Sequence, residues 1–198
     1  QVVWAPRGGY GAIRLLPWLE EATQKSGAPP RKLLVGFSDA TALLDYARVR
    51  WGWATLHAPM VAMADARGVD RVFKKTADLV RGGCDLGWTS RVKSWSGSVA
   101  ARGPVVGGNL TVWNALTGTP FETSAEGCIA FFEDVGESPS RLDRTVSQLY
   151  LSGRLHGARA LLLGGFKDCE DVPPNSGTGR SARPVRPRIP TRTALKTI

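Results

Sequence analysis

Short apolar runs alternate with helix-periodic segments along most of this 198-residue chain. The clearest unit is the apolar run Lys32–Gly36, which a helical pattern of apolar residues follows over residues 40–47,. Two further apolar runs, Cys128–Phe132 and Ala160–Leu163, flank a second helical face. Strands that alternate with helices in this way predict the α/β class with largely parallel sheets.

The same patterns predict how the chain is divided. Residues 1–65 form one α/β domain, 66–95 a linker region, 96–171 a second, smaller mixed α/β domain, and 172–198 a disordered basic tail. In the first domain, Val2–Ala5 reads as the end of a strand, and Pro17 interrupts a helix-like stretch that follows a glycine-rich turn,. Because the chain opens in mid-strand without Met, we expect its N-terminal part to be missing.

Composition narrows the function classes. A hydrophobic content of 42% suffices for a core without disulfides or metals. No run approaches the ~20 apolar residues of a membrane helix, so we expect a soluble protein with no membrane partner. The three cysteines (Cys84, Cys128 and Cys169) have no C-x-x-C spacing and only two histidines accompany them, which favours neither a disulfide framework nor a metal site. We expect no cofactor.

The net charge of +9 would ordinarily suggest nucleic-acid binding. Six of the basic residues, five prolines and no acid fall in residues 172–198, so the excess is mostly a property of the tail. A segment of this composition cannot bury enough apolar surface to order itself. It is either a functional basic arm or the product of a frameshift or truncation, and we favour the second interpretation, with nucleic acid an unlikely partner.

Ser38 is the candidate nucleophile. It lies in Gly36-Phe37-Ser38-Asp39-Ala40, between a predicted strand and a predicted helix, where a tight turn would project the hydroxyl out of the sheet. The pattern is G-x-S-x-A rather than G-x-S-x-G, and a serine before a helix is more often an N-cap. Glu133, the first acid after the run Cys128–Phe132, reads by itself only as a strand-end carboxylate.

Several segments together resemble, in order and approximate spacing, the LD-carboxypeptidase family of serine peptidases over about residues 2–171. They are Arg7-Gly8-Gly9-Tyr10-Gly11 with Leu15-Leu16-Pro17, Gly36-Phe37-Ser38-Asp39, His57-Ala58-Pro59, Gly107-Gly108-Asn109-Leu110-Thr111, and Phe132-Glu133-Asp134-Val135-Gly136-Glu137 with Arg141-Leu142-Asp143-Arg144. The resemblance implies a flavodoxin-like first domain, incomplete here, and an incomplete second α/β domain. It also implies a Ser, Glu, His triad that removes the terminal D-alanine of cytoplasmic murein tetrapeptides during peptidoglycan recycling.

The resemblance assigns roles to particular residues. Ser38 is the expected nucleophile and Glu133 the expected triad carboxylate. Backbone N–H groups of Asp39 and Gly9 are the expected oxyanion hole, since such a hole needs donors aimed at developing negative charge. Arg7, Gly8 and Asn109 are expected to bind the murein peptide.

One member of the triad is missing from this pattern. The family's histidine lies in a Gly-His segment that this chain lacks; His57 matches a family position that is not the base, and His156 lies between a helix and a strand. We therefore expect this chain to be inactive and poorly folded. Two alternatives stay open: a microcin C-type aminoacyl-nucleotide immunity peptidase, in which Trp88 or Trp95 would stack on the base, and a non-catalytic module with a nucleic-acid-binding tail. A homodimer also stays open.

Overall fold

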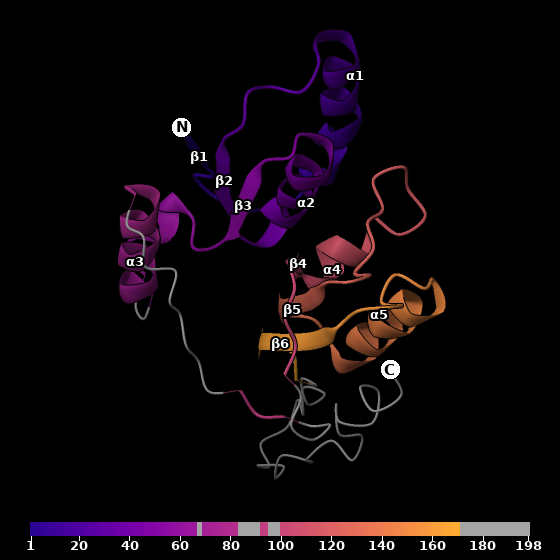
Figure 1. Ribbon diagram of the computed structural model, residues 1–198. Coiled ribbons are helices and arrows are strands. Elements are labelled where there is room, and N and C mark those ends of the chain that lie inside the picture. Colours follow the sequence, from indigo (N-terminus) through magenta and orange to yellow (C-terminus); the bar gives the residue numbers. More distant parts are fainter. Residues whose placement is uncertain (67–68, 83–91, 95–99, 171–198) are drawn as a thin grey trace, which may run out of the picture.

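The computed structural model describes residues 1–66, 69–82, 92–94 and 100–170. Two three-stranded sheets organise this part of the chain, and every strand pair in them is parallel. Helices follow the strands in sequence, as Figure 1 shows. The predicted α/β class with parallel sheets is confirmed.

The first sheet has the strand order β1-β2-β3. Its strands are β1 (Val2–Trp4), β2 (Leu33–Gly36) and β3 (Ala54–His57). Its helical segments are η1 (Ala12–Leu15), α1 (Leu16–Ser26), η2 (Ser38–Ala40), α2 (Thr41–Arg50), η3 (Val61–Met63) and α3 (Asp70–Val80). Pro17 does not interrupt a helix as predicted, because it stands in the first turn of α1, where its missing N–H costs no hydrogen bond.

The second sheet has the order β4-β5-β6. Its strands are β4 (Val105–Asn109), β5 (Ile129–Val135) and β6 (Ala160–Lys167), and its helices are α4 (Leu110–Asn114) and α5 (Pro139–Leu151). Strand β5 continues past the run predicted for it, so Glu133 lies within the strand rather than at its end. Strand β6 likewise continues through Gly164 and Gly165.

Helix α2 joins the two halves of the molecule. It contacts β2 and β3 of the first sheet as well as β4 and α4 of the second half, and Figure 1 shows it between them. The Thr41 hydroxyl accepts a hydrogen bond of 3.0 Å from the backbone N–H of Asn109. The buried Asp45 carboxylate accepts a bond of 3.1 Å from Trp113 Nε1 and another from the Thr123 hydroxyl.

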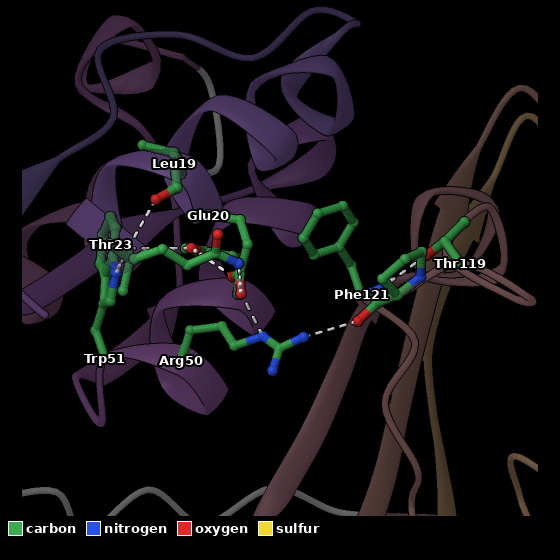
Figure 2. A network of polar contacts seen from close by, with 10 residues as sticks. Leu19, Glu20, Thr23, Arg50, Trp51, Thr119 and Phe121 are labelled. Atoms are coloured by element: carbon green, nitrogen blue, oxygen red, sulfur yellow. Dashed lines mark hydrogen bonds and ion pairs between the residues drawn. The ribbon is translucent and has the colours of Figure 1, made fainter. Parts of the chain in front are cut away.

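A polar network reinforces the same junction at the surface (Figure 2). The Thr23 hydroxyl of α1 accepts a 2.8 Å hydrogen bond from Trp51 Nε1, and Glu20 forms an ion pair of 3.6 Å with Arg50. The same Arg50 donates to the backbone oxygen of Pro120, in the loop after α4. The loop of the second half is thereby tied to the helices of the first.

The second sheet packs on a core that includes Trp113, Phe132 and Leu149. Arg154 is buried beside this core, with its guanidinium carbon 3.5 Å from the centre of the Trp113 ring. It donates hydrogen bonds to the backbone oxygens of Trp113 (2.7 Å) and Thr123 (2.8 Å). Burial lowers the pKa of this guanidinium to about 10.

The predicted domains can be compared with these elements. The first sheet falls within 1–65 and the second within 96–171, whereas α3 lies wholly within the predicted linker 66–95. The boundaries themselves stay predictions. The tail 172–198 and Cys84 lie outside the described residues. Over the described part of the chain, each helix is too short or too polar to cross a bilayer.

Replacing Arg154 by Lys tests the role of the buried guanidinium. A lysine cannot donate to two carbonyl groups in a planar fork while it stacks on an indole. We expect Arg154→Lys to lower the free energy of unfolding by about 2 kcal/mol in urea denaturation. The matched control is Arg141→Lys, whose side chain is 68% exposed. A loss at Arg154 no larger than that of the control would contradict this role.

Candidate active site

Ser38 lies at the sharp turn between β2 and α2. Its backbone is left-handed, with φ of +58°, whereas Phe37 before it is extended. Among the described residues, only Asp168 is another non-glycine residue with positive φ. A serine held in this way between strand and helix has the geometry of a nucleophile elbow, and backbone strain of this kind concentrates at functional sites.

The residues two positions away on either side explain how the turn closes. A Cβ atom placed on Gly36 would lie 2.7 Å from the Cβ of Ala40, which is closer than two carbon atoms can pack. The turn therefore requires glycine on the strand side and a small residue on the helix side. The G-x-S-x-A pattern satisfies both requirements, with alanine replacing the second glycine.

The Gly8–Gly9 turn lies against this elbow. A Cβ atom on Gly8 would be 3.6 Å from the Cβ of Ser38 and 3.0 Å from Met60 Cε. Among the described residues, neither Gly9 nor Asp39 uses its backbone N–H as a hydrogen-bond donor. The Asp39 carboxylate accepts a 2.9 Å bond from the N–H of Ala12, so its side chain fastens the end of the glycine-rich turn to the elbow.

Glu133 differs sharply from the acid that follows it. Asp134 accepts hydrogen bonds from the Asn109 amide (3.0 Å), the Thr111 hydroxyl (2.7 Å) and backbone N–H groups. Glu133 is also buried, but its Oε1 atom has no hydrogen-bond partner. Asp134 is thus held by several donors within the framework, whereas Glu133 Oε1 is unsatisfied.

A bulge in the sheet lies opposite Glu133. Phe132 pairs with Leu163, but Asp134 pairs with Phe166, so two residues of β6, Gly164 and Gly165, lie opposite the single residue Glu133, and β6 carries one extra residue at this level. A Cβ atom on Gly164 would lie 3.3 Å from that of Glu133. Bulges of this kind re-aim side chains beside active sites.

His57 is a functional candidate that the sequence pattern does not predict. Its Nε2 atom lies 3.5 Å from Glu133 Oε1, and the pair joins the carboxyl end of β3 to the second sheet. The imidazole also packs edge-on against Phe37, next to Ser38, with ring centres 5.1 Å apart. A signal was present, because β2 and β3 are adjacent parallel strands and their ends meet at one sheet edge.

The remaining predicted residues have distinct environments. Arg7 is exposed on the turn before Gly8. Asn109 is buried, with its Oδ1 accepting from Val112 N–H at 3.1 Å and its Nδ2 donating to Asp134. That amide caps α4 and holds Asp134, so substrate binding by Asn109 stays a prediction. Trp88 and Trp95 lie outside the described residues.

A shallow pocket opens beside His57. It has a volume of about 260 Å³ and predominantly apolar walls, which include Phe37, His57, Pro59 and Met63. Within the described ranges, no cluster of three or more His, Cys, Asp or Glu side chains could hold a metal ion. The chemistry available among these residues is that of hydroxyl, imidazole, carboxylate and backbone N–H groups.

Gly36→Ala tests the closure of the elbow. The added methyl group overlaps Ala40, and we expect overpacking to cost about 1–3 kcal/mol in the free energy of unfolding. Gly165→Ala is the control, because a Cβ atom there meets nothing within 4 Å. Equal stability of the two variants in urea denaturation would contradict the close contact.

Ser38→Gly and Ser38→Ala together test the strained backbone. Glycine adopts positive φ without steric cost and alanine does not. We expect the glycine variant to unfold with a free energy about 1 kcal/mol higher than that of the alanine variant, although neither has the hydroxyl. The reverse order would show that residue 38 is not held in the left-handed region.

Comparison with known proteins identifies the family. The sequence profile of the LD-carboxypeptidase N-terminal domain matches residues 1–58, and that of the LD-carboxypeptidase C-terminal domain matches residues 102–191. The second match continues past the predicted start of the tail at 172. The chain is 33% identical over 175 residues to the murein tetrapeptide carboxypeptidase of Pseudomonas aeruginosa, and the match covers 84% of this chain and 56% of that protein.

Solved structures agree with this result. The muramoyltetrapeptide carboxypeptidase of Oxalobacter formigenes is 32% identical with a TM-score of 0.68, covering 87% of this chain and 58% of that one. The wild-type microcin C7 self-immunity protein has a TM-score of 0.66 at 22% identity, with 91% and 61% covered, and shares the fold. The chain spans about half the length of the curated relatives it matches. On these matches to both of its domains, the chain belongs to the LD-carboxypeptidase family.

Proposed function

We propose that Ser38 and Glu133 are the nucleophile and triad carboxylate of a serine carboxypeptidase. Its substrate would be a murein tetrapeptide, cleaved in the cytoplasm at the L,D bond before the terminal D-alanine during peptidoglycan recycling. The observation that carries the proposal is the left-handed Ser38 at the end of β2, with Gly8 packed against it. The names of the relatives at 32–33% identity support the substrate class.

The proposed reaction is an acyl transfer in two steps. Ser38 Oγ attacks the carbonyl carbon of the scissile bond, and the resulting oxyanion accepts hydrogen bonds from N–H groups of Asp39 and Gly9. The hydroxyl proton passes through a base to the leaving amine, which departs as D-alanine. Water then cleaves the ester at Ser38 and regenerates the hydroxyl.

These 198 residues do not include the Gly-His segment that carries the catalytic base in the family. The chain has two histidines, His57 and His156, and no Gly-His pair. Among the described residues, Ser38 Oγ makes no hydrogen bond. A serine without a hydrogen-bonded base keeps its proton and is a poor nucleophile. We therefore propose that this chain binds substrate and turns it over very slowly.

Recognition of the substrate would use the exposed edge of the elbow. Arg7 stands at the start of the glycine turn with an exposed side chain, where its guanidinium could take the terminal carboxylate of D-alanine in bidentate fashion. Gly8 and Gly9 carry no side chains, which lets a peptide approach the backbone donors closely. No observation on the described residues favours the aminoacyl-nucleotide alternative or a nucleic-acid function.

Peptide binding and turnover by the 198-residue chain test the proposal together. In amide NMR spectra, we expect a murein tetrapeptide ending in D-alanine to shift the signals of Gly8, Gly9 and Asp39. The same peptide ending in L-alanine is the matched control and should shift them less. Release of D-alanine should be at least ~10⁴-fold slower than by an intact family enzyme, as for loss of a triad member.

Two outcomes would contradict the proposal. Amide shifts at these positions with adenosine monophosphate and none with the tetrapeptide would favour the nucleotide alternative. D-alanine release at the rate of an intact enzyme would show that a base is present after all. In either experiment Arg7→Gln separates carboxylate recognition from the backbone donors, because it removes the charge of the side chain and keeps a polar group that can donate hydrogen bonds.

A further inference from the structure

His57 and Glu133 form a buried pair whose polar atoms are not otherwise satisfied. Nε2 of His57 and Oε1 of Glu133 are 3.5 Å apart. Neither imidazole nitrogen nor Glu133 Oε1 has a hydrogen-bond partner, and all three atoms are buried. A buried carboxylate oxygen without a donor is costly, and Nε2 of His57 is the donor in place to serve it.

The surroundings hold this pair in one arrangement. The imidazole lies between the rings of Phe37 and Phe131, whose centres are 5.1 and 5.6 Å from its own. A Cβ atom on Gly108 would come within 3.0 Å of Nδ1. A side chain at residue 108 would crowd the imidazole, so glycine there makes room for the ring beside Glu133, while the two aromatic rings pack against it.

Glu133 has fewer polar partners than the adjacent Asp134. Asp134 accepts from four donors, whereas His57 is the one ion-pair partner of Glu133 in the described residues. The second oxygen of Glu133 makes no hydrogen bond there. One carboxylate oxygen therefore faces His57, and the other is available.

We propose that His57 is a positioning residue for Glu133. It carries its proton on Nε2 and directs it at Oε1, which fixes the carboxylate and leaves Oε2 for the imidazole of the triad. This role rests on the proposed function, because it assigns the triad carboxylate to Glu133. It differs from that of a base, since His57 serves the carboxylate and does not bond to Ser38.

The two histidines make the pair directly observable. With ¹⁵N-labelled histidine, long-range ¹H–¹⁵N spectra recorded about two pH units above the ordinary histidine pKa of about 6.5 report which nitrogen carries the proton. We expect His57 to show the Nε2–H form alone. The exposed His156 serves as the internal control and should show both tautomers, and His156→Gln assigns the signals.

Variants on both sides complete the test. Glu133→Leu should convert His57 to a mixture of tautomers, and Glu137→Leu, a nearby carboxylate that pairs with Arg141 instead, should leave it unchanged. His57→Phe should move the ¹³C signal of the Glu133 carboxyl group. His57→Gln, which keeps a donor near the Nε2 position, should restore the signal toward its original place.

The outcomes separate this proposal from the one it rests on. A His57 ring that populates both tautomers in the unaltered chain would overturn it. A Glu133 carboxyl signal that ignores His57→Phe would do the same, and this result also covers the case in which Glu133→Leu does not fold. A single Nε2–H form that is lost in Glu133→Leu supports the pairing even if the tetrapeptide does not bind, because that failure refutes the proposed function.

Discussion

The hydrogen bond from Asn109 N–H to the Thr41 hydroxyl joins the two halves of the candidate site. Thr41 opens α2 directly after the elbow that holds Ser38. Asn109 pairs with Glu133 across the second sheet. One buried contact of 3.0 Å therefore links α2, which follows the proposed nucleophile Ser38, to β4, which pairs with the strand that carries the proposed carboxylate Glu133. Asp45, one turn further along α2, accepts a hydrogen bond from Trp113 of α4 and joins the same two halves.

Within that frame, crowding and strain determine which residues are free to act. Gly36 and Ala40 approach so closely that residue 36 has no room for a side chain, and Ser38 between them lies in the left-handed region. Asp134 is saturated with donors, and the adjacent Glu133 is not. The one extra residue on β6 makes a bulge in the sheet opposite Glu133. Ser38 is thus distinguished by its left-handed backbone, and Glu133 by a buried carboxylate oxygen without a hydrogen-bond partner.

Local patterns were sufficient to predict the strand and helix around Ser38, because both have strong apolar periodicity. They were not sufficient for β4, whose Gly107 and Gly108 have weak strand propensity and are held by pairing with β5. Strand β5 is longer than its apolar run predicts, because acidic residues are rare in strands. Here Asp134 remains in the strand and is buried, and its hydrogen-bond donors satisfy its carboxylate. The contact of His57 with Glu133 joins two sheets, and the two residues are far apart in the sequence. Local sequence patterns cannot predict a contact between such distant residues.

A structure of the 198-residue chain bound to an intact murein tetrapeptide tests the central claim most directly, because slow turnover would preserve the substrate. The account predicts that the carbonyl carbon of the L,D bond lies about 3–3.5 Å from Ser38 Oγ, with its oxygen directed at the N–H groups of Gly9 and Asp39. A peptide bound away from the elbow, or with its terminal D-alanine remote from Ser38, would contradict it.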